Sequence, residues 1–581
     1  MAKAWKVKAT IPETSLSDLR DYHPLIARIL FGRGIKDKAA AEEFLNPQYE
    51  RLYSPFLFKD MEKAVRRVWE AIEKNEKIVI YGDYDADAVT ANAILRQTFK
   101  YLGAAAESYI PDRFSEGYGV NLEALEKIRD SAFAKATADR QGSGIIITVD
   151  CGTNSVEAAE FCRANGIDLI ITDHHEIIGP LPDAFALINS KNPNDIYPYA
   201  EITGVGVAFK LACAILKNPK SEARNPKLKT GFEKWLLDLV AIGTVADCHS
   251  LLGENRILVK YGLKVLAKTR WPGLRALVDS AGLDFSQKPP DTFTLGFILA
   301  PRLNAAGRLQ HANIALNLLL EEDLGAARQQ AAALEQINKK RQDLTLRVLS
   351  EAREKAVTVG DRKILVLWNE DWHRGIVGLV AGKLAEEFNK PAIVLEKGLE
   401  ESLGSARTAG EFDIIASLKY AASHLVRFGG HKQAAGLTLR NENFEDFYQK
   451  ILEFAEDRLP EENLEMIFQA DAELEVADLR LEILDLLSAL EPFGVDNPKP
   501  KFLISKLQIE SLRPVGSGSK HLQLQLSLGN KTVGAIWFNG NGFAKNLKLG
   551  DTVNVIAELL RDNWNGNENF KLKIVDLYFQ D

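Results

Sequence analysis

The sequence predicts an α/β protein in which two α/β domains are joined by a long helix and followed by a small β-barrel. Three observations support this fold class. Short aliphatic runs without alternation recur in the first half, most of them followed by a helical pattern, as in a parallel sheet buried on both faces. A long charged helical stretch then precedes a second α/β pattern. The last part of the chain changes to strands, several of them alternating, that are separated by polar or glycine-rich turns.

Five aliphatic runs predict the strands of the first parallel sheet. Helical patterns that close on glycine follow the first and third runs, at 90–103 and 155–166. Two segments, 131–143 and 217–231, have the composition of exposed inserted loops and are assigned no chemistry. With the N-terminal segment, this domain is expected to span residues 1–320. The expected strands are KIVIYGD at 77–83, AESYIPD at 106–112, GIIITVD at 144–150, IDLIITD at 167–173 and FALINS at 185–190.

The rest of the chain divides at the long helix. The charged, alanine-rich pattern at 324–357 predicts one continuous helix, and residues 321–357 are expected to connect the domains. A second α/β domain is expected at 358–460, from the runs RKILVLW, GIVGLVAGKLAEEF and PAIVLE. Five strand-like runs within 461–581 fit a nucleic-acid-binding barrel of the OB type, and the pattern alone leaves a sandwich open.

Composition limits the class of protein. With 581 residues, 46% of them hydrophobic, the chain can bury several cores, and no run approaches the roughly 20 apolar residues of a transmembrane helix. The N-terminal residues lack the apolar block of a signal peptide, so we expect a cytoplasmic protein without membrane contact. The four cysteines form no CxxC pair, which argues against a zinc knuckle or a disulfide framework. The net charge of -8 argues against a generally basic surface, so any phosphate-binding site must be local.

Three carboxylates stand within a short stretch directly after the first expected strand. Asp83, Asp85 and Asp87 repel one another at neutral pH, and each resists removal from water. Turns and helix caps could explain one or two of them. A bound cation explains all three, because hard divalent ions prefer oxygen ligands and convert the repulsion into coordination.

Further acids and histidines follow other elements of the same domain. Asp150 ends the third expected strand, and Asp173 ends the fourth. His174 and His175 come directly after Asp173, and Asp247 ends a buried helix. Ligands of open parallel sheets gather outside the carboxyl ends of the strands, so these groups are expected at one edge. Each alone could be a cap or a surface acid, but their recurrence at strand ends favours a metal site.

The motifs DYDAD, VDCGT, TDHHE and GTVAD resemble the four motifs of the DHH phosphoesterase family, and SAR and FGGHKQAAG resemble its associated C-terminal domain. With WHRGIVGLVAGKLAEEF, PRLNAAGRL and EPFGVDNPKP before the barrel, nearly the whole chain resembles the bacterial single-stranded-DNA exonucleases of that family. Ala88 and Ala91 depart from the pattern, because the family usually has Gly and Ser there. Ala88 is compatible with the first loop if its backbone does not need a positive φ.

The resemblance implies two divalent cations, Mn²⁺ by preference or Mg²⁺, and phosphodiester hydrolysis without a covalent intermediate. Asp85, with Asp83, would hold the first ion, Asp150 would bridge the two, and the remaining ligands would hold the second. His175 would face the substrate phosphate. Mixed carboxylate and imidazole ligation suits manganese better than calcium. The implied metal ligands are Asp83, Asp85, Asp87, Asp150, His174 and Asp247, and the implied catalytic residues are Asp85, Asp87, Asp150, His174, His175 and Asp247.

The resemblance also implies a substrate channel, much of it in the second α/β domain. Ser405 and Arg407 form a natural clasp for a terminal 5′-phosphate. His431 follows two glycines, which permit close approach to the backbone, although a simple glycine turn is the alternative. An ordinary surface arginine is nearly as good an interpretation of Arg113. The implied substrate-binding residues are Arg113, Arg302 or Arg308, Ser405, Arg407, Gly429, Gly430 and His431.

Three functions are consistent with the sequence. The first is a 5′-to-3′ single-stranded-DNA exonuclease that releases 5′-mononucleotides in DNA repair and recombination. The second is a DHH phosphodiesterase acting on short or cyclic oligonucleotides or on pyrophosphate, a class that needs no additional strand-binding barrel. The third is a non-catalytic single-strand-binding protein, which the intact set of acids and histidines opposes.

The expected partner is single-stranded DNA, with a single-stranded-DNA-binding protein and a helicase as further partners, and a monomer is expected. In the barrel, basic and aromatic residues sit in or beside turns, where a single strand can stack and follow a basic groove. Trp564 and Phe570, taken singly, are more simply core or rim aromatics.

Overall fold

The computed structural model describes most of the chain. The two segments expected as inserted loops lie partly outside the described residues, at 134–143 and 225–230. Their described ends are helical, as a π-helical turn at Arg129–Phe133 and as α8 at Lys220–Arg224. The described residues are 3–8, 17–117, 119–133, 144–224, 231–408, 410–459, 466–475, 478–529, 531–564 and 567–579.

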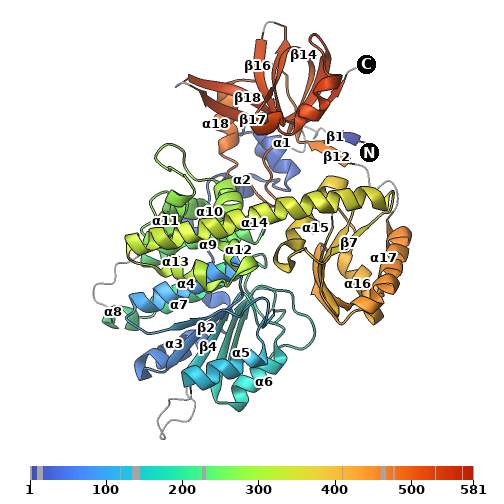
Figure 1. Cartoon of the computed structure of the whole chain (residues 1–581). Coiled ribbons are helices and arrows are strands. Elements are labelled where there is room, and N and C mark those ends of the chain that lie inside the picture. The colour runs from blue at the N-terminus through green and yellow to red at the C-terminus, as the bar shows by residue number, and fades with distance from the viewer. Residues whose placement is uncertain are drawn as a thin grey trace. The chain divides into compact units, whose positions relative to one another are not determined.

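The chain forms two compact units (Figure 1). The first comprises Tyr53–His249 and Tyr261–Glu465 and contains both α/β domains. The second comprises Ala2–Leu52, Ser250–Lys260 and Met466–Asp581 and contains the barrel. The segment before Tyr53 therefore packs with the barrel.

The first unit contains a five-stranded parallel sheet, which confirms the predicted fold class. Its strands are β2 (Lys77–Gly82), β3 (Glu107–Tyr109), β4 (Gly144–Val149), β5 (Ile167–Asp173) and β6 (Ala186–Asn189). The order is β3-β2-β4-β5-β6, and every neighbouring pair is parallel. Gly82 pairs with Val149, and Val149 pairs with Thr172, so the ends of β2, β4 and β5 are in register. The residues that follow these strands therefore meet at one edge.

Helices cover both faces of this sheet (Figure 1). On one face, α5 (Leu122–Ile128) and α6 (Val156–Ala164) pack against Val79, Ile146 and Ile171. The helices of the other layer are α3 (Met61–Lys74), α4 (Ala86–Tyr101), α7 (Gly204–Leu216) and α9 (Leu237–Ala246). α4 is buried almost all round, because the sheet, α7 and α9 all pack against it. This enclosure explains why α4 and α9 carry apolar residues on every face.

The long connecting helix is confirmed as α14 (Leu324–Val359), which has 36 residues. Asp323 caps its start by accepting a hydrogen bond from Ala326 N at 2.7 Å, and Gly360, with a φ of 76°, ends it. α14 packs on α11, α12 and α13 and then on the second α/β domain. The helices before it are α10 (Gly253–Leu266), α11 (Pro272–Ser280), α12 (Ala300–Leu309) and α13 (Asn313–Leu320), with a π-helical segment at Thr294–Leu299.

The second α/β domain has a mixed five-stranded sheet. Its elements are β7 (Leu365–Asn369), α15 (Arg374–Phe388), β8 (Ala392–Lys397), β9 (Glu401–Arg407), α16 (Ile414–Tyr420), β10 (Arg427–Gly430), β11 (Ala434–Arg440) and α17 (Phe444–Arg458). The order is β10-β11-β9-β8-β7, and only β7 and β8 run parallel. α14 and α15 cover one face, and α16 and α17 cover the other.

The second unit contains a closed five-stranded barrel, so the OB-type prediction is confirmed over the sandwich. Its strands are β14 (Phe502–Val515), β15 (His521–Leu528), β16 (Lys531–Trp537), β17 (Thr552–Trp564) and β18 (Asn567–Phe579). The order is β14-β15-β16-β18-β17, and β17 pairs again with β14 to close the barrel. β16 and β18 are parallel, and the other neighbouring pairs are antiparallel.

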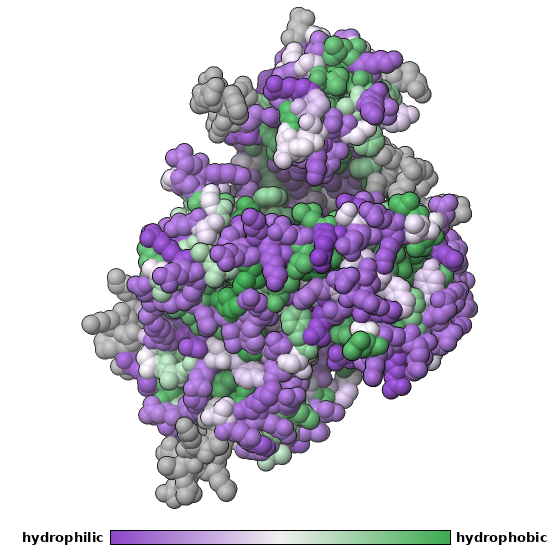
Figure 2. All heavy atoms as spheres, in the orientation of Figure 1, coloured by the Kyte–Doolittle hydropathy of each residue, from purple (hydrophilic) through white to green (hydrophobic). Residues whose placement is uncertain are grey.

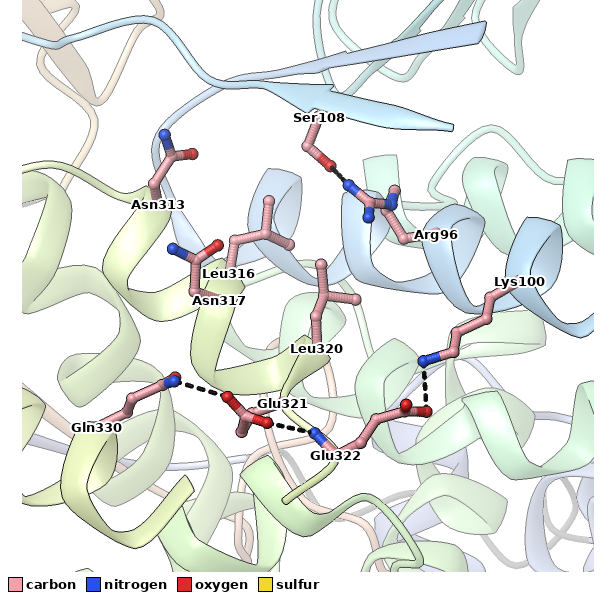
Figure 3. A pocket seen from close by; sticks show the side chains of 10 residues that line it. All are labelled: Arg96, Lys100, Ser108, Asn313, Leu316, Asn317, Leu320, Glu321, Glu322 and Gln330. Carbon is pink, nitrogen blue, oxygen red and sulfur yellow. Dashed lines mark hydrogen bonds and ion pairs between the residues drawn. The ribbon is translucent and has the colours of Figure 1, made fainter. Parts of the chain in front are cut away.

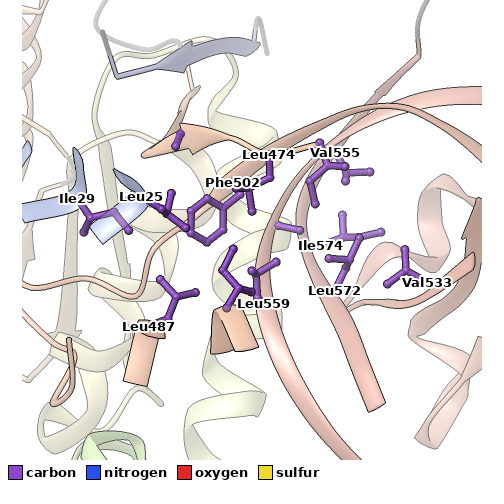
Figure 4. Packing of buried hydrophobic residues seen from close by; sticks show 14 of the residues in the cluster. Leu25, Ile29, Leu474, Leu487, Phe502, Val533, Val555, Leu559, Leu572 and Ile574 are labelled. Atoms are coloured by element: carbon purple, nitrogen blue, oxygen red, sulfur yellow. The ribbon is translucent and has the colours of Figure 1, made fainter. Parts of the chain in front are cut away.

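The barrel core continues into the N-terminal segment. Phe502 of β14 is buried in one cluster with Leu25 and Ile29 of α1 (Pro24–Gly32) (Figure 4). The unit also contains α2 (Lys38–Leu45), α18 (Leu481–Ser488), β13 (Ala472–Glu473), and β1 (Lys3–Val7) paired in parallel with β12 (Met466–Ala470). Phe570 packs partly buried against this core, as the simpler interpretation predicts, whereas the side chain of Trp564 lies outside the described residues.

The face shown in Figure 2 is dominated by hydrophilic side chains, with hydrophobic ones in patches. Among the described residues, no helix combines the length and apolarity that crossing a membrane requires. None of the four cysteines, all of which the structure describes, forms a disulfide; Cys151, Cys162 and Cys213 are buried and Cys248 is exposed.

Candidate metal centre and phosphate site

The first acidic loop joins β2 to α4. Asp83 directly follows β2, and Asp85 is the N-cap of α4, where its Oδ1 accepts two main-chain hydrogen bonds at 2.9 and 3.1 Å. Asp87 lies in the first turn, and its Oδ1 accepts a hydrogen bond from the main-chain N of Val205 at 3.0 Å. The first N–H of α4 donates to Asn304 Oδ1 of α12 at 2.8 Å. The loop is therefore fixed from three sides.

Asp150 follows β4 in a left-handed conformation, with a φ of 60°. Its main-chain N donates to Thr172 O at 3.0 Å. Two glycines leave room for the acids, because a Cβ on Gly204 would lie 2.5 Å from Asp150 Oδ1 and one on Gly243 would lie 2.7 Å from Asp87 Oδ1. α7 and α9 therefore approach the acids more closely than any side chain would allow.

Asp173 ends β5 and orients the histidines that follow it. Its Oδ1 accepts hydrogen bonds from the main-chain N of His174 and His175 and lies 2.8 Å from His175 Nδ1. Its Oδ2 accepts a hydrogen bond from Thr153 N at 2.8 Å. Burial opposes ionisation of this carboxyl, but the contact with His175 outweighs it, so the pKa of Asp173 lies below its usual value. Both oxygens are engaged, which makes Asp173 a positioning residue.

His174 lies between the acids of two other elements. Its Nε2 is 3.0 Å from Asp150 Oδ1 and 3.6 Å from Asp247 Oδ2, at the end of α9. The ring centroid of His174 is 4.7 Å from that of His175 and 4.7 Å from that of His249. The structure thus brings together the acids and histidines that the sequence places after separate elements.

Unpaired buried atoms show what this edge is suited to bind. Leaving such an atom without a partner costs about 1–3 kcal/mol, and coordination of a cation removes that cost. Carboxylate oxygens and imidazole nitrogens are donors suited to Mn²⁺, and the oxygens also suit Mg²⁺. The residues present therefore fit divalent cations. Within the described residues, the buried atoms of this group without a hydrogen-bond partner are Asp83 Oδ1, Asp87 Oδ2, Asp150 Oδ1, His174 Nδ1, His174 Nε2 and Asp247 Oδ2.

The protonation equilibria reflect the crowding of these groups. Burial, with the charge of Asp85, raises the pKa of Asp83 to about 8. Burial also raises the pKa of Asp87 and Asp150 well above the usual value. Burial lowers the pKa of His174 to about 3, so this imidazole is neutral, which is the form that binds metals. Bound metal ions would supply the positive charge that favours ionisation of these buried carboxylates.

Three arginines form an uncompensated positive group in the same unit. Burial lowers the pKa of Arg308 to about 9, and the charges of Arg113 and Arg407 act in the same direction. Burial and then Arg113 lower the pKa of Arg407. Their contacts are with main-chain oxygens and, for Arg113, with the ring of Tyr84 at 4.8 Å. None of the three forms an ion pair with a carboxylate among the described residues, so an anion is the ligand they lack.

The N-terminus of α15 completes this positive group. A Cβ on Gly378 would meet Ser405 Oγ and Arg407 Nη2, each at 3.2 Å, so both side chains lie against the second turn of α15. A Cβ on Gly375 would lie 1.9 Å from Arg308 O, so the first turn abuts α12. Helix N-termini favour anions through their free N–H groups and dipole. Together these groups form a candidate phosphate site.

The β10–β11 hairpin brings His431 beside the metal centre. The His431 and His175 ring centroids are 6.4 Å apart, with an interplanar angle of 17°. Burial and the charge of His175 lower the pKa of His431. Open space surrounds the missing Cβ of Gly429, so a ligand can approach its backbone. Gly430 has a φ of 144°, and a Cβ there would lie 2.3 Å from Ala434 O, so this glycine is required by the hairpin itself.

Arg302 differs from the other implied arginines. Its Nε lies 2.6 Å and its Nη2 3.2 Å from the carboxylate of Glu335 on α14, and its Nη1 donates to Ile298 O at 2.6 Å. These contacts occupy the guanidinium and join α12 to α14. Of the two arginines that the sequence leaves open, the structure favours Arg308 for binding an anion.

Ala88 and Ala91 lie inside α4 and are completely buried. Neither is among the residues with a positive φ. The first loop therefore needs no glycine at Ala88.

Several residues that shape the site are not predicted from the sequence. Asn304 and His249 stand within or next to motifs that carry the family resemblance, so their positions are a usable signal. Asp173 is expected at the edge, but the sequence assigns it no role. Gly204 and Gly243 cannot be singled out from the sequence, where they are only small residues in apolar helices. Their importance is that a Cβ at either position would collide with an acid of the site.

A separate polar cavity of about 520 Å³ lies among α4, β3, α13 and α14 (Figure 3). In it, Arg96 donates to Ser108 Oγ at 3.0 Å, and Gln330 donates to Glu321 at 2.9 Å. None of the site residues implied by the sequence lines this cavity.

Comparison with known proteins identifies three family domains in the chain, which agree with the two α/β domains and the barrel of the structure. Residues 77–244 match the DHH family N-terminal domain, residues 361–457 the DHHA1 domain and residues 470–576 the RecJ OB domain. The single-stranded-DNA-specific exonuclease RecJ of Bacillus subtilis is 37% identical over 97% of this chain and 69% of that protein.

Two solved structures of Thermus thermophilus RecJ are similar over 100% of this chain at 28% identity. The complex with Mn²⁺ has a TM-score of 0.83 and is covered over 80% of its length, and the complex with Mg²⁺ has a TM-score of 0.77 and is covered over 79%. Because the similarity spans all three matched domains and two thirds or more of these relatives, the chain belongs to the RecJ family of DHH phosphoesterases.

Proposed function

We propose that this protein is a single-stranded-DNA-specific exonuclease that hydrolyses phosphodiester bonds with two divalent cations, Mn²⁺ by preference. The observation that carries the proposal is the pairing of a metal-binding edge with an uncompensated arginine group in one unit. The Arg113 guanidinium lies 4.8 Å from the ring of Tyr84, which stands between Asp83 and Asp85. Asn304 of α12, the helix that carries Arg308, accepts a hydrogen bond from the start of α4 at 2.8 Å, so the arginine group adjoins the acidic loop and one ligand can contact both. A phosphodiester carries the negative charge that suits both.

Each residue of the site has a distinct task in this proposal. Asp83 and Asp85 would hold one ion, Asp150 would be shared by both ions, and Asp87, His174 and Asp247 would hold the second. When bound, two divalent ions activate a water molecule and stabilise the leaving oxygen of the phosphodiester. His175, oriented by Asp173, lies beside His431, where both rings can contact the phosphate that is cut.

The proposed polarity is 5′-to-3′, with 5′-mononucleotides as products. Ser405, Arg407 and Arg308 at the start of α15 would hold a terminal 5′-phosphate, and the next phosphodiester would then lie at the metals. The barrel supports a polymeric substrate, because short or cyclic oligonucleotides need no additional strand-binding domain. We further propose a cytoplasmic monomer that works in DNA repair and recombination with a helicase and a single-stranded-DNA-binding protein.

The test is digestion of an end-labelled single strand, with a 5′-phosphate or a 5′-hydroxyl, with and without Mn²⁺. Arg407→Ala should reduce kcat/KM on the 5′-phosphorylated strand about 10- to 150-fold, which corresponds to the loss of about 1.5–3 kcal/mol, the range for a charge-assisted hydrogen bond. It should leave the 5′-hydroxyl strand and Mn²⁺ binding nearly unchanged. Arg353→Ala, which removes an exposed arginine paired with Glu387, is the matched control. A protein that ignores the 5′-phosphate, or that degrades from the 3′ end, would refute the end-anchoring mechanism.

A further inference from the structure

His249 lies at the metal-binding edge, and its close contact with Asp247 does not satisfy that carboxylate. It follows Asp247 by two residues, and its Nδ1 is 2.8 Å from Asp247 Oδ2. Yet Asp247 Oδ2 is one of the buried atoms without a hydrogen-bond partner among the described residues, so the two atoms are close without hydrogen-bond alignment. The same nitrogen also makes a long, and therefore weak, hydrogen bond of 3.4 Å with the main-chain oxygen of Asp247.

The spacing of neighbouring donor atoms indicates what His249 does. Adjacent ligands of an octahedral ion with bonds of about 2.1 Å lie about 3 Å apart. The separations here are 3.0 Å from Asp150 Oδ1 to His174 Nε2, 3.6 Å from that nitrogen to Asp247 Oδ2, and 2.8 Å from Asp247 Oδ2 to His249 Nδ1. One donor atom from each of His174, Asp247 and His249 lies within 4.8 Å of the others, as ligands of a single ion do.

We propose that His249 is a further ligand of the second ion and gives that site its preference for Mn²⁺ over Mg²⁺. Two imidazole nitrogens, from His174 and His249, make this donor set softer than the carboxylate set of Asp83 and Asp85. Imidazole suits transition metals, whereas Mg²⁺ takes oxygen ligands. The proposal rests on the proposed two-metal function and deepens it, by assigning metal selectivity to one residue.

The test measures binding of Mn²⁺ and of Mg²⁺ to the full chain by calorimetry, and nitrogen ligation of bound Mn²⁺ by pulsed electron paramagnetic resonance. His249→Ala should weaken Mn²⁺ binding at one of the two sites about 10- to 100-fold and change Mg²⁺ binding less than about threefold. It should also remove one nitrogen coupling. His249→Gln, which offers an oxygen, should keep Mg²⁺ binding and still lose the Mn²⁺ preference. His424→Ala, in the second α/β domain, is the control.

The outcomes separate this inference from the proposed function. Equal losses for Mn²⁺ and Mg²⁺ would show that His249 only positions Asp247 and would overturn the inference. An unchanged nitrogen coupling in folded His249→Gln would overturn it too. If the normal protein binds Mn²⁺ as expected and the His249 variants give either of these two results, the inference fails but the proposed function stands. If the normal protein binds no Mn²⁺, both fail.

Discussion

Gly204 offers a severe test of how the metal-binding edge is built. In Gly204→Ala the new Cβ would lie 2.5 Å from Asp150 Oδ1, 2.6 Å from its Cβ and 2.7 Å from its Cγ. These distances are about 1 Å short of ordinary van der Waals contact, so Asp150 or the start of α7 must move by a comparable amount. Neither can yield easily, because Asp150 N is bonded to Thr172 O, and Val205 N is bonded to Asp87. A shift of about 1 Å at a catalytic group can reduce turnover about 100-fold.

The variant should lose function while staying folded. Overpacking costs about 1–3 kcal/mol, and replacing Gly by Ala in a helix returns about 1 kcal/mol, so the net loss of stability is small. The assay compares kcat on single-stranded DNA, Mn²⁺ binding by calorimetry and Tm by circular dichroism. Gly206→Ala is the matched control, because its Cβ would also meet an atom at 2.5 Å, but that atom belongs to Ile202. It should change Tm about as little as Gly204→Ala does and keep Mn²⁺ binding. Normal Mn²⁺ affinity in Gly204→Ala would refute the reasoning.

Two further predictions concern pH and the substrate path. Burial raises the pKa of Asp238 to about 6, although Thr269 and Trp271 donate hydrogen bonds to it. The protonated carboxyl is therefore favoured in the folded chain and adds at most about 3 kcal/mol to the free energy of unfolding. This contribution is complete below about pH 4 and is lost as the pH rises through about 6. The Tm of the normal protein relative to Asp238→Asn should fall over that interval, and a constant difference would contradict the assignment. Gly429→Ala should keep the normal Tm and raise KM for single-stranded DNA, whereas Gly430→Ala should lower Tm. Equal Tm values for the two variants would contradict a substrate role for Gly429 and a structural role for Gly430.

The sequence predicts those parts of the fold in which local pattern and burial agree. The strands of the parallel sheet are continuous aliphatic runs because both faces are covered, and few other kinds of element produce short runs of that type. The 36 residues of α14 are predicted from propensity and charge, since a long helix needs little tertiary information. The closed barrel is predicted only as far as its strands, because the pairing of β14 with β17 depends on sequence-distant contacts.

The mixed sheet shows what pattern alone misses. Ser405 pairs with Gly436, and Gly436 pairs with Gly429, so three residues of separate strands form one row across β9, β11 and β10. Among the described residues, and apart from each glycine and its two chain neighbours, no atom lies within 4 Å of where a Cβ would stand on Gly429 or Gly436. The resulting strip without side chains, ending at Ser405, exists only through strand pairing. The motifs identify the individual residues as candidates, but they do not predict the surface that strand pairing forms from these residues.

The oxygens of the acids explain how one edge serves both folding and coordination. Asp85 uses an oxygen to cap α4, and Asp87 uses Oδ1 to fix the start of α7, while Asp87 Oδ2 has no hydrogen-bond partner among the described residues. Each of these acids is thus partly structural, as expected for Asp at caps. Asp173 has both oxygens occupied and orients His175 instead. A shared position at strand ends therefore does not make the acids equivalent. The ones suited to a metal are those whose hydrogen bonds leave an oxygen buried and unpaired.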